Sequence, residues 1–430
     1  MHQQQSPEYW IDRTVDPERV LGDGEWVVRF NRRAFEIDTH LADITTYPDS
    51  VSGKELRSVI ETVSRTADED LFYLNDPNTR RLETADYDRY RASLALDRIE
   101  ERVPVRFGLV LHRTNMRRWP TRDFVIRSKE TRDLDRFQEN ALFPGEAVAV
   151  LHESADGEWF FVRSYNYHAW IRKIRIALGP RDRVVDYARA EPFLVVTGAR
   201  ATTNFSPSDE SLSELQLDMG VRLPLTAPEN MPSHVDGQNP LSSHAVEMPI
   251  RGEDGGLDFR TVLVGRGQDV REGYLPYTRG NIVNQAFKFL GERYGWGHSY
   301  NARDCTGLVL DVYRSMGILL PRNSGQQADS PIGHTVRLRE EHGRESRFEA
   351  LSGANVGDLV YAPGHVMIFL GFDEGEPWVV HHMSGSGWVD DRGEPIDGIM
   401  NGVAATALTK TEMAPGKTYF DEMTAIKAIR

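Results

Sequence analysis

The spacing of apolar residues changes twice along this chain, and that change restricts its architecture more than any other feature. Up to about residue 100, apolar side chains recur at roughly helical intervals, as in Ser52–Val63 and Asp86–Arg102. From Val103 they alternate with polar ones, which is typical of strands, and after Tyr277 the two patterns are mixed. A chain of 430 residues is long enough for two to four domains, so we expect each pattern to be a separate domain.

The alternating region predicts two small β-barrels, one in residues 103–180 and one in residues 190–275. In the first, Glu146–Leu151 and Glu158–Arg163 flank the Asp156-Gly157 pair, which is a strong hairpin signal. Residues 227–256 are rich in Pro, Ser, Asn, Gly and His, and we expect them to form a long loop. Residues 1–102 are predicted to be a mostly helical stabilising segment that carries no recognisable chemical motif.

The chain has one cysteine, Cys305, which excludes an intrachain disulfide and a multi-cysteine zinc site. It stands in Asp304-Cys305-Thr306-Gly307, where a loop is expected to become a helix. Unpaired N–H groups at a helix start lower a thiol's pKa and stabilise an oxyanion, so this position suits a nucleophile. The alternative is a small buried residue that packs the helix onto a sheet.

Histidines on two predicted strands favour the nucleophile interpretation. His365 opens the apolar run that ends at Gly371, and a second run, Trp378–Val380, ends in His381-His382. An antiparallel pair joined by a turn at Asp373-Glu374-Gly375 brings His365 near one of these histidines. Alternation along the strand does not choose between His381 and His382, since neighbouring residues point to opposite faces. Each histidine could instead have a purely local structural role.

Several function classes are disfavoured by composition. The net charge of -14 argues against nucleic-acid binding, which needs an excess of Lys and Arg. No segment reaches the roughly 18 apolar residues of a membrane span. The first residues show no basic region followed by an apolar run. The protein is therefore expected to be cytoplasmic if the chain is complete, and exported, to the periplasm or outside the cell, if a leader has been removed.

Five motifs together give the C-terminal region a specific family likeness. In order they are Tyr294-Gly295-Trp296-Gly297, Asp304-Cys305-Thr306-Gly307-Leu308-Val309, Pro321-Arg322-Asn323-Ser324-Gly325-Gln326-Gln327, Gly357-Asp358-Leu359-Val360 and Gly364-His365-Val366. In order and spacing, residues 277–430 resemble the NlpC-type family of bacterial cell-wall cysteine peptidases. The two predicted barrels and the first 102 residues resemble one branch of that family, which has paired bacterial SH3 domains and an N-terminal stabilising segment.

The resemblance implies an α+β chain with a papain-like catalytic domain and a Cys-His-His triad of Cys305, His365 and His381. It implies a γ-D-glutamyl-L-diamino acid endopeptidase that acts on murein stem peptides with a free N-terminal L-Ala. Asp304 would bind the amine, Trp296 and Ser324 would contact substrate, and Tyr167 of the first SH3 domain would close the site. No cofactor and no metal are expected, and the chain is predicted to be a monomer.

Two residues depart from the family pattern, and other functions stay open. Thr306 stands where Ser is usual, and His298 follows Gly297 where a second Gly is common. An amidase or acyltransferase on the same fold is one alternative, and a non-catalytic cell-wall binding SH3 protein is another. A zinc hydrolase is disfavoured because no helix carries His-Glu-x-x-His spacing.

Overall fold

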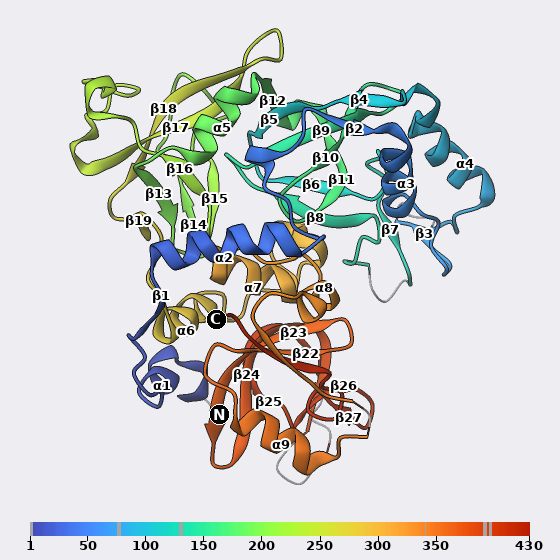
Figure 1. Ribbon diagram of the computed structural model, residues 1–430, viewed down its shortest axis with the longest axis vertical. Helices are drawn as coiled ribbons and strands as arrows, with labels where there is room; N and C mark the ends of the chain where they lie inside the picture. Colours follow the sequence, from blue (N-terminus) through green and yellow to red (C-terminus); the bar gives the residue numbers. More distant parts are fainter. Residues whose placement is uncertain (1–2, 75–78, 129–131, 340, 390–393, 395–397) are drawn as a thin grey trace. The chain divides into compact units, whose positions relative to one another are not determined.

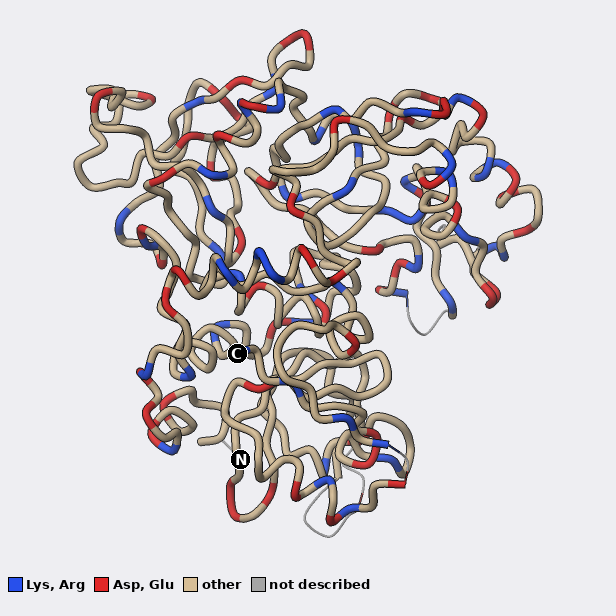
Figure 2. Tube along the Cα trace, in the orientation of Figure 1, with Lys and Arg blue, Asp and Glu red and all other residues tan. Residues whose placement is uncertain are grey.

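The computed structural model describes residues 3–74, 79–128, 132–339, 341–389, 394 and 398–430. The chain forms two compact units, whose elements are labelled in Figure 1. The first unit comprises Met1–Leu41, Tyr274–Tyr294 and Asn301–Arg430, and the second comprises Ala42–Gly273 and Gly295–Tyr300. Lys, Arg, Asp and Glu are interspersed along the described chain rather than gathered in one block (Figure 2).

An antiparallel sheet forms the centre of the first unit. Its strands follow the order β21-β28-β22-β23-β24-β26-β27, and β25 pairs with β24. The strands are β21 (His334–Arg337), β22 (Leu359–Ala362), β23 (His365–Asp373), β24 (Glu376–Trp388), β25 (Met400–Ala407), β26 (Thr411–Ala414), β27 (Lys417–Thr418) and β28 (Ala425–Ala428). The two predicted strands that begin at His365 and Trp378 are confirmed as β23 and β24, although β24 is longer than expected.

Helices of the first unit cover this sheet, and one of them begins at the cysteine. They are α6 (Arg279–Phe287), α7 (Cys305–Arg314), α8 (Ser324–Asp329) and α9 (Arg344–Ser352). Helix α7 packs against β23 and β24 (Figure 1). The Thr278 hydroxyl caps α6 by accepting the N–H of Asn281 at 3.1 Å. Thr278 has the extended backbone that a cap requires because it ends β20 (Tyr277–Thr278).

The first residues of the chain belong to this same unit. They form α1 (Pro7–Ile11), β1 (Val20–Gly22) and α2 (Gly24–Ile37), and β1 pairs with β20. The side-chain amide of Gln5 bonds to the backbone of Ala405 in both directions, at 2.7 and 3.0 Å. This amide therefore satisfies the edge of β25 as a neighbouring strand would. The structure thus groups residues 1–41 with the C-terminal region and residues 42–102 with the second unit.

The second unit contains the expected barrel-like sheet, with strand order β12-β5-β9-β10-β11-β6-β8. Its strands are β5 (Arg106–Val110), β6 (Thr114–Arg117), β8 (Gln138–Leu142), β9 (Ala147–Glu153), β10 (Trp159–Arg163), β11 (His168–Arg172) and β12 (Ile176–Gly179). The hairpin predicted at Asp156-Gly157 is confirmed, because β9 and β10 pair with Phe160 opposite Glu153. Gly157 adopts φ 72°, a left-handed conformation that favours glycine.

The next part of the second unit differs from the sequence prediction in one respect. Its strands form three small sheets, β16-β13-β19, β14-β15 and β17-β18. They are β13 (Phe193–Val196), β14 (Arg200–Thr202), β15 (Gln216–Asp218), β16 (Arg222–Pro224), β17 (Ser243–Arg251), β18 (Leu257–Gly265) and β19 (Val270–Glu272). The predicted loop over residues 227–256 is wrong for its second half, where Ser243–Arg251 form β17, whereas residues 227–242 contain no strand. Pro249 weakened the strand signal in the sequence, because proline is rare within strands. In the structure, β17 and β18 form a two-stranded sheet, which tolerates a proline at a free edge.

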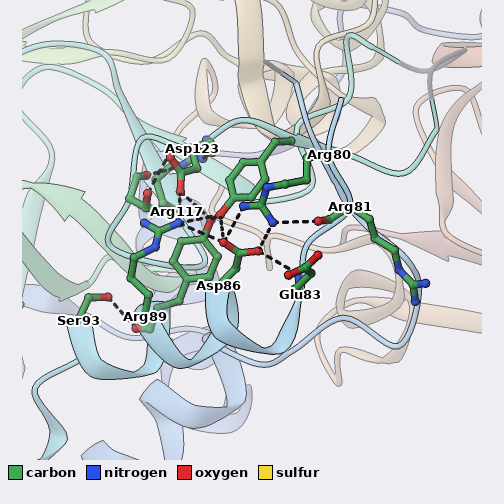
Figure 3. A network of polar contacts seen from close by, with 11 residues as sticks. Arg80, Arg81, Glu83, Asp86, Arg89, Ser93, Arg117 and Asp123 are labelled. Atoms are coloured by element: carbon green, nitrogen blue, oxygen red, sulfur yellow. Dashed lines mark hydrogen bonds and ion pairs between the residues drawn. The ribbon is translucent and has the colours of Figure 1, made fainter. Parts of the chain in front are cut away.

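Two helices precede the seven-stranded sheet in the second unit. Helix α3 (Gly53–Val63) matches its prediction, whereas α4 (Thr84–Ser93) ends well before Arg102 because Ala95 adopts φ 50°. Figure 3 shows the polar network that holds α4. Arg80 donates two hydrogen bonds to Asp86 at 2.7 and 2.8 Å and holds the pKa of that carboxyl well below its usual range. Asp86 also accepts the N–H of Glu83, so one carboxylate both caps the helix and anchors the preceding loop.

Candidate active site

Cys305 is the first residue of α7, and its side chain lies against the start of β23. Its Sγ is 4.0 Å from the carbonyl oxygen of Gly364, and the Val366 N–H also interacts with it. These two residues flank His365, so the fold brings the thiol to the strand end where the sequence places the candidate base. The prediction of a helix beginning at Cys305 is confirmed.

The thiol and the imidazole are both neutral in this environment. Burial, with a contribution from the charge of Asp304, raises the pKa of Cys305 to about 12, although the N–H groups of Val366 and Thr306 act in the opposite direction. Burial and the charge of His382 lower the pKa of His365 to about 3. The helix start was expected to favour the thiolate, but removal of water outweighs it here. Attack by sulfur would therefore require the proton to move to the base during the reaction.

The register of β23 and β24 brings His365 and His381 together. Ile368 pairs with Val380, as expected for an antiparallel hairpin, and Nε2 of His365 lies 2.8 Å from Nδ1 of His381. The other nitrogen of His381, Nε2, lies 2.9 Å from Oγ1 of Thr406 on β25. His381 and Thr406 are fully buried, at 0% and 1% exposure. A continuous chain of hydrogen bonds therefore links three strands behind the imidazole of His365.

His382 points to the other side of the sheet, as strand alternation requires. Its ring packs edge-on against Tyr294 with centroids 5.2 Å apart, and it makes no hydrogen bond to His365. Burial lowers its pKa to about 4. Of the two histidines that the sequence pattern left open, His381 is the one that reaches His365.

Asp304 forms the N-cap of α7 and is part of a buried ion pair. Its Oδ1 accepts the N–H of Gly307 at 2.7 Å and the hydroxyl of Thr306 at 2.9 Å. Its Oδ2 accepts from Arg322 at 2.5 Å, and Arg322 also donates to the Thr306 hydroxyl. The family resemblance implies that Asp304 binds a substrate amine, but the charge of Asp304 is already balanced by Arg322. Thr306 fits this network, since its hydroxyl can donate and accept at once.

Ser324 begins α8, two residues after Arg322, and is 8% exposed. The preceding residue, Asn323, caps this helix in a reciprocal arrangement with Gln326. The first unit therefore contains Cys305, His365, His381, Asp304 and Ser324.

The other two predicted site residues, Trp296 and Tyr167, lie in the second unit, and both form hydrogen bonds to strand β8. Trp296 donates its indole N–H to the carbonyl of Gln138 at 2.9 Å, and Tyr167 donates its hydroxyl to Glu139 at 2.6 Å. Gln138 and Glu139 begin β8. The second unit thus brings Trp296 and Tyr167 to neighbouring positions along β8.

The Gly-Trp-Gly-His segment lies directly on β8. Gln138 donates to the carbonyl of Gly297 at 2.8 Å, and a Cβ at Gly297 would lie 2.8 Å from Gln138 Cγ and 3.2 Å from the Glu139 backbone. Both Gly297 and His298 have left-handed φ angles, 56° and 64°. A glycine, common in the family at position 298, adopts this conformation without strain, whereas histidine does so at a cost. Here the His298 ring packs edge-on against Phe143, and its carbonyl accepts from Arg113.

Two residues of the candidate site were not identified from the sequence. Thr406 follows no motif and reaches the site only through the pairing of β24 with β25. Arg322 stands within a recognised motif, and its role could have been inferred because a carboxylate next to a nucleophilic thiol needs a cation nearby. Among the residues that the structure describes, no group of three or more His, Cys, Asp or Glu is arranged to hold a metal ion. Within the same residues, no helix is long and apolar enough to cross a bilayer.

Comparison with known proteins identifies the two kinds of domain. The profile of the NlpC/P60 family matches residues 291–396, and that of the SH3 domain (SH3b1 type) matches residues 125–172. The structure of an NlpC/P60 endopeptidase from Photobacterium damselae subsp. piscicida superposes with a TM-score of 0.71, at 15% identity, over 96% of this chain and 94% of that one. This similarity shows a common fold.

Two relatives match by sequence over part of their length. The gamma-D-glutamyl-L-lysine dipeptidyl-peptidase of Bacillus cereus is 25% identical over 184 residues, which cover 40% of this chain and 50% of that protein. The probable endopeptidase p60 of Listeria monocytogenes serovar 1/2a is 35% identical over 120 residues, or 25% of this chain and 21% of that protein. The matched regions therefore span half or less of these relatives.

Proposed function

We propose that this chain, which contains an NlpC/P60 domain and an SH3 domain of the SH3b1 type, is a cysteine peptidase of peptidoglycan stem peptides. The NlpC/P60 family consists of cysteine peptidases that act on cell-wall peptides. The observation that carries the proposal is the position of the Cys305 sulfur beside the residues that flank His365, together with the hydrogen bond from His365 to His381. An SH3 protein with an inert peptidase domain would have no need of this arrangement.

The proposed reaction begins with transfer of the thiol proton of Cys305 to Nδ1 of His365. The sulfur attacks the carbonyl carbon of the scissile amide, and N–H groups at the start of α7 stabilise the oxyanion. His365 then gives its proton to the leaving amine, the carbon–nitrogen bond breaks, and a thioester remains on Cys305. Water, deprotonated by His365, attacks the thioester and releases the carboxylate product and the thiol.

His381 and Thr406 fix the tautomer of His365 in this scheme. Since Nδ1 of His365 must accept the proton, its Nε2–H donates to Nδ1 of His381. His381 then carries its own proton on Nε2 and donates it to Oγ1 of Thr406. This direction of hydrogen bonding also stabilises the positive charge that forms on His365, as the third member of a triad does.

For the substrate we propose a stem peptide cleaved at the γ-D-glutamyl bond to a diamino acid, with a free N-terminal L-Ala. The name of the Bacillus cereus relative, a gamma-D-glutamyl-L-lysine dipeptidyl-peptidase, supports this bond. Asp304 is the proposed amine acceptor, although its charge is already shared with Arg322, so the amine would add to an existing ion pair. Ser324, Trp296 and Tyr167 are proposed to contact the substrate, and the site of action is proposed to be the cell envelope.

Mass spectrometry of defined stem peptides incubated with the protein tests this function. We expect cleavage of L-Ala-γ-D-Glu-diaminopimelate, or of its lysine counterpart, and no cleavage by Cys305→Ala. An N-acetylated peptide is expected to be cleaved more slowly if the free amine is recognised. Undiminished turnover by Cys305→Ala would refute the mechanism, and thiol-dependent activity on other acyl donors alone would favour an amidase or acyltransferase.

A further inference from the structure

Tyr419 packs against both imidazoles of the candidate site, although neither the motifs nor the proposed reaction use it. Its ring centroid lies 4.9 Å from that of His365 and 5.1 Å from that of His381. The ring is tilted by 38° on His365 and meets His381 edge-on at 87°. Tyr419 is 5% exposed, so it contributes a buried wall beside the hydrogen bond that joins the two histidines.

Tyr419 is held in place by hydrogen bonds of its hydroxyl and of its backbone. Its hydroxyl lies 2.8 Å from Oγ of Ser386, which is itself 4% exposed, and its backbone N–H donates to the carbonyl of Thr411 at 3.0 Å. Ser386 lies on β24, the strand that carries His381, just after Gly385 with its φ of 114°. The tyrosine is thus tethered to the same strand whose histidine it contacts.

We propose that Tyr419 is a positioning residue of the active site, whose ring fixes the orientation of His365 and His381 and keeps water from their hydrogen bond. The proposal deepens the proposed function and rests on His365 acting as the base. Edge-on and tilted packing of aromatic rings is orientation-dependent, so a tethered ring restricts the rotation of both imidazoles. Exclusion of water strengthens the hydrogen bond between them, because the local dielectric constant falls.

The ring rather than the hydroxyl is the active part of this residue. The hydroxyl is engaged with Ser386, and burial raises the pKa of Tyr419 to about 12, so it does not exchange protons at neutral pH. The groups that act on His365 are His381 and Tyr419, whose rings contact it, Cys305, which lies beside its chain neighbours, and Asp304 and His382, whose charges influence it from further away. Among these, only Tyr419 contributes an uncharged aromatic ring to both histidines.

Variants at Tyr419 distinguish positioning from simple packing, because Tyr419 also belongs to the hydrophobic core of the first unit. The variant Tyr419→Phe keeps the ring, and Tyr419→Leu removes it. The matched control is Phe420→Leu, which removes a neighbouring aromatic ring that is 0% exposed and packs on Phe348 at 4.6 Å. Thermal unfolding of all three variants measures the structural cost separately.

Alkylation of Cys305 by iodoacetamide over a range of pH provides a readout that needs no substrate. The chain has a single cysteine, so every label reports on this thiol. We expect Tyr419→Leu to change the pH profile of alkylation, while Tyr419→Phe and Phe420→Leu keep the wild-type profile. On the stem peptide, Tyr419→Leu is expected to lower kcat about tenfold or more with little change in KM, and Tyr419→Phe to retain most of kcat.

A folded Tyr419→Leu variant whose alkylation profile and kcat match those of Phe420→Leu would overturn the proposal. If the leucine variant does not fold, Tyr419→Met, whose longer and flexible side chain can fill an irregular space, is judged by the same criteria. Failure of the proposed function has a different signature. In that case the pH profile of Cys305 alkylation still differs between the wild type and Tyr419→Leu, but the wild type cleaves no stem peptide.

Discussion

Replacing Thr406 by valine isolates the last hydrogen bond behind the two histidines that we propose to be catalytic. Valine has nearly the same shape as threonine, so the change removes an acceptor with little change in packing. In the wild type, Nε2 of His381 lies 2.9 Å from Oγ1 of Thr406, and both side chains are at most 1% exposed. The variant therefore leaves a buried N–H without a partner, or forces His381 into the other tautomer, which opposes the required tautomer of His365.

The expected loss follows from the cost of an unsatisfied buried group. That cost is about 1–3 kcal/mol, and it applies most strongly when His365 becomes positively charged in the transition state. At about 1.4 kcal/mol for each factor of ten, kcat/KM should fall by about 5- to 150-fold. The assay is steady-state cleavage of the stem peptide that the wild type hydrolyses, with folding checked by circular dichroism.

Thr411→Val is the matched control for this experiment. Thr411 is also buried, at 0% exposure, and its hydroxyl donates to the carbonyl of Ala407 at 2.9 Å, away from the imidazoles. We expect it to lose stability without losing activity. If a folded Thr406→Val variant were as active as Thr411→Val, the hydrogen-bond chain through His381 would have no part in catalysis.

Two further predictions concern stability. Arg303 is 0% exposed and forms ion pairs with Asp311 and Glu292. Arg303→Met should therefore lower the free energy of unfolding of the first unit, measured by urea titration, by about 3–5 kcal/mol. The double variant with Asp311→Leu should recover part of this loss, because it also removes one of the carboxylates left unpaired. An unchanged urea midpoint for Arg303→Met would contradict this. His365 and His382 have folded-state pKa values of about 3 and about 4, below the unfolded value of 6.5, so the unfolded chain binds more protons between these limits. Stability should therefore be complete above pH 6.5 and fall as the pH is lowered toward 3, and a His382→Phe variant should lose less on acidification.

The local part of the candidate site could be predicted from the sequence because its signals are local. The cap at Asp304, the helix from Cys305 and the hairpin that carries His365 and His381 each depend on residues close together in the chain. Thr406 could not be found in this way, since it lies 25 residues beyond His381 and is brought there by strand pairing. Tyr419 could not be found either, because it is also far from both histidines in the sequence and reaches them only through the fold.

The errors in the fold prediction have separate physical causes. Strand β17 was missed because a composition rich in Pro, Ser and Gly outweighed the apolar positions Val246 and Met248. The thiol pKa was expected to be lowered because a sequence reveals a helix start but not the depth of burial. Burial depends on the whole fold, and for Cys305 it is the largest influence. The predicted second barrel and the detailed domain boundaries remain predictions.

The first unit is discontinuous in sequence, and this affects how the protein can be made. Its residues 1–41 leave the ribosome before the second unit does, but their partners, such as Ala405 for Gln5, emerge only after it. Residues 42–273 of the second unit are complete before those partners emerge, and they can fold while residues 1–41 are still unpaired. The nascent chain would thus have no assembled candidate site until β23, β24 and β25 have been made.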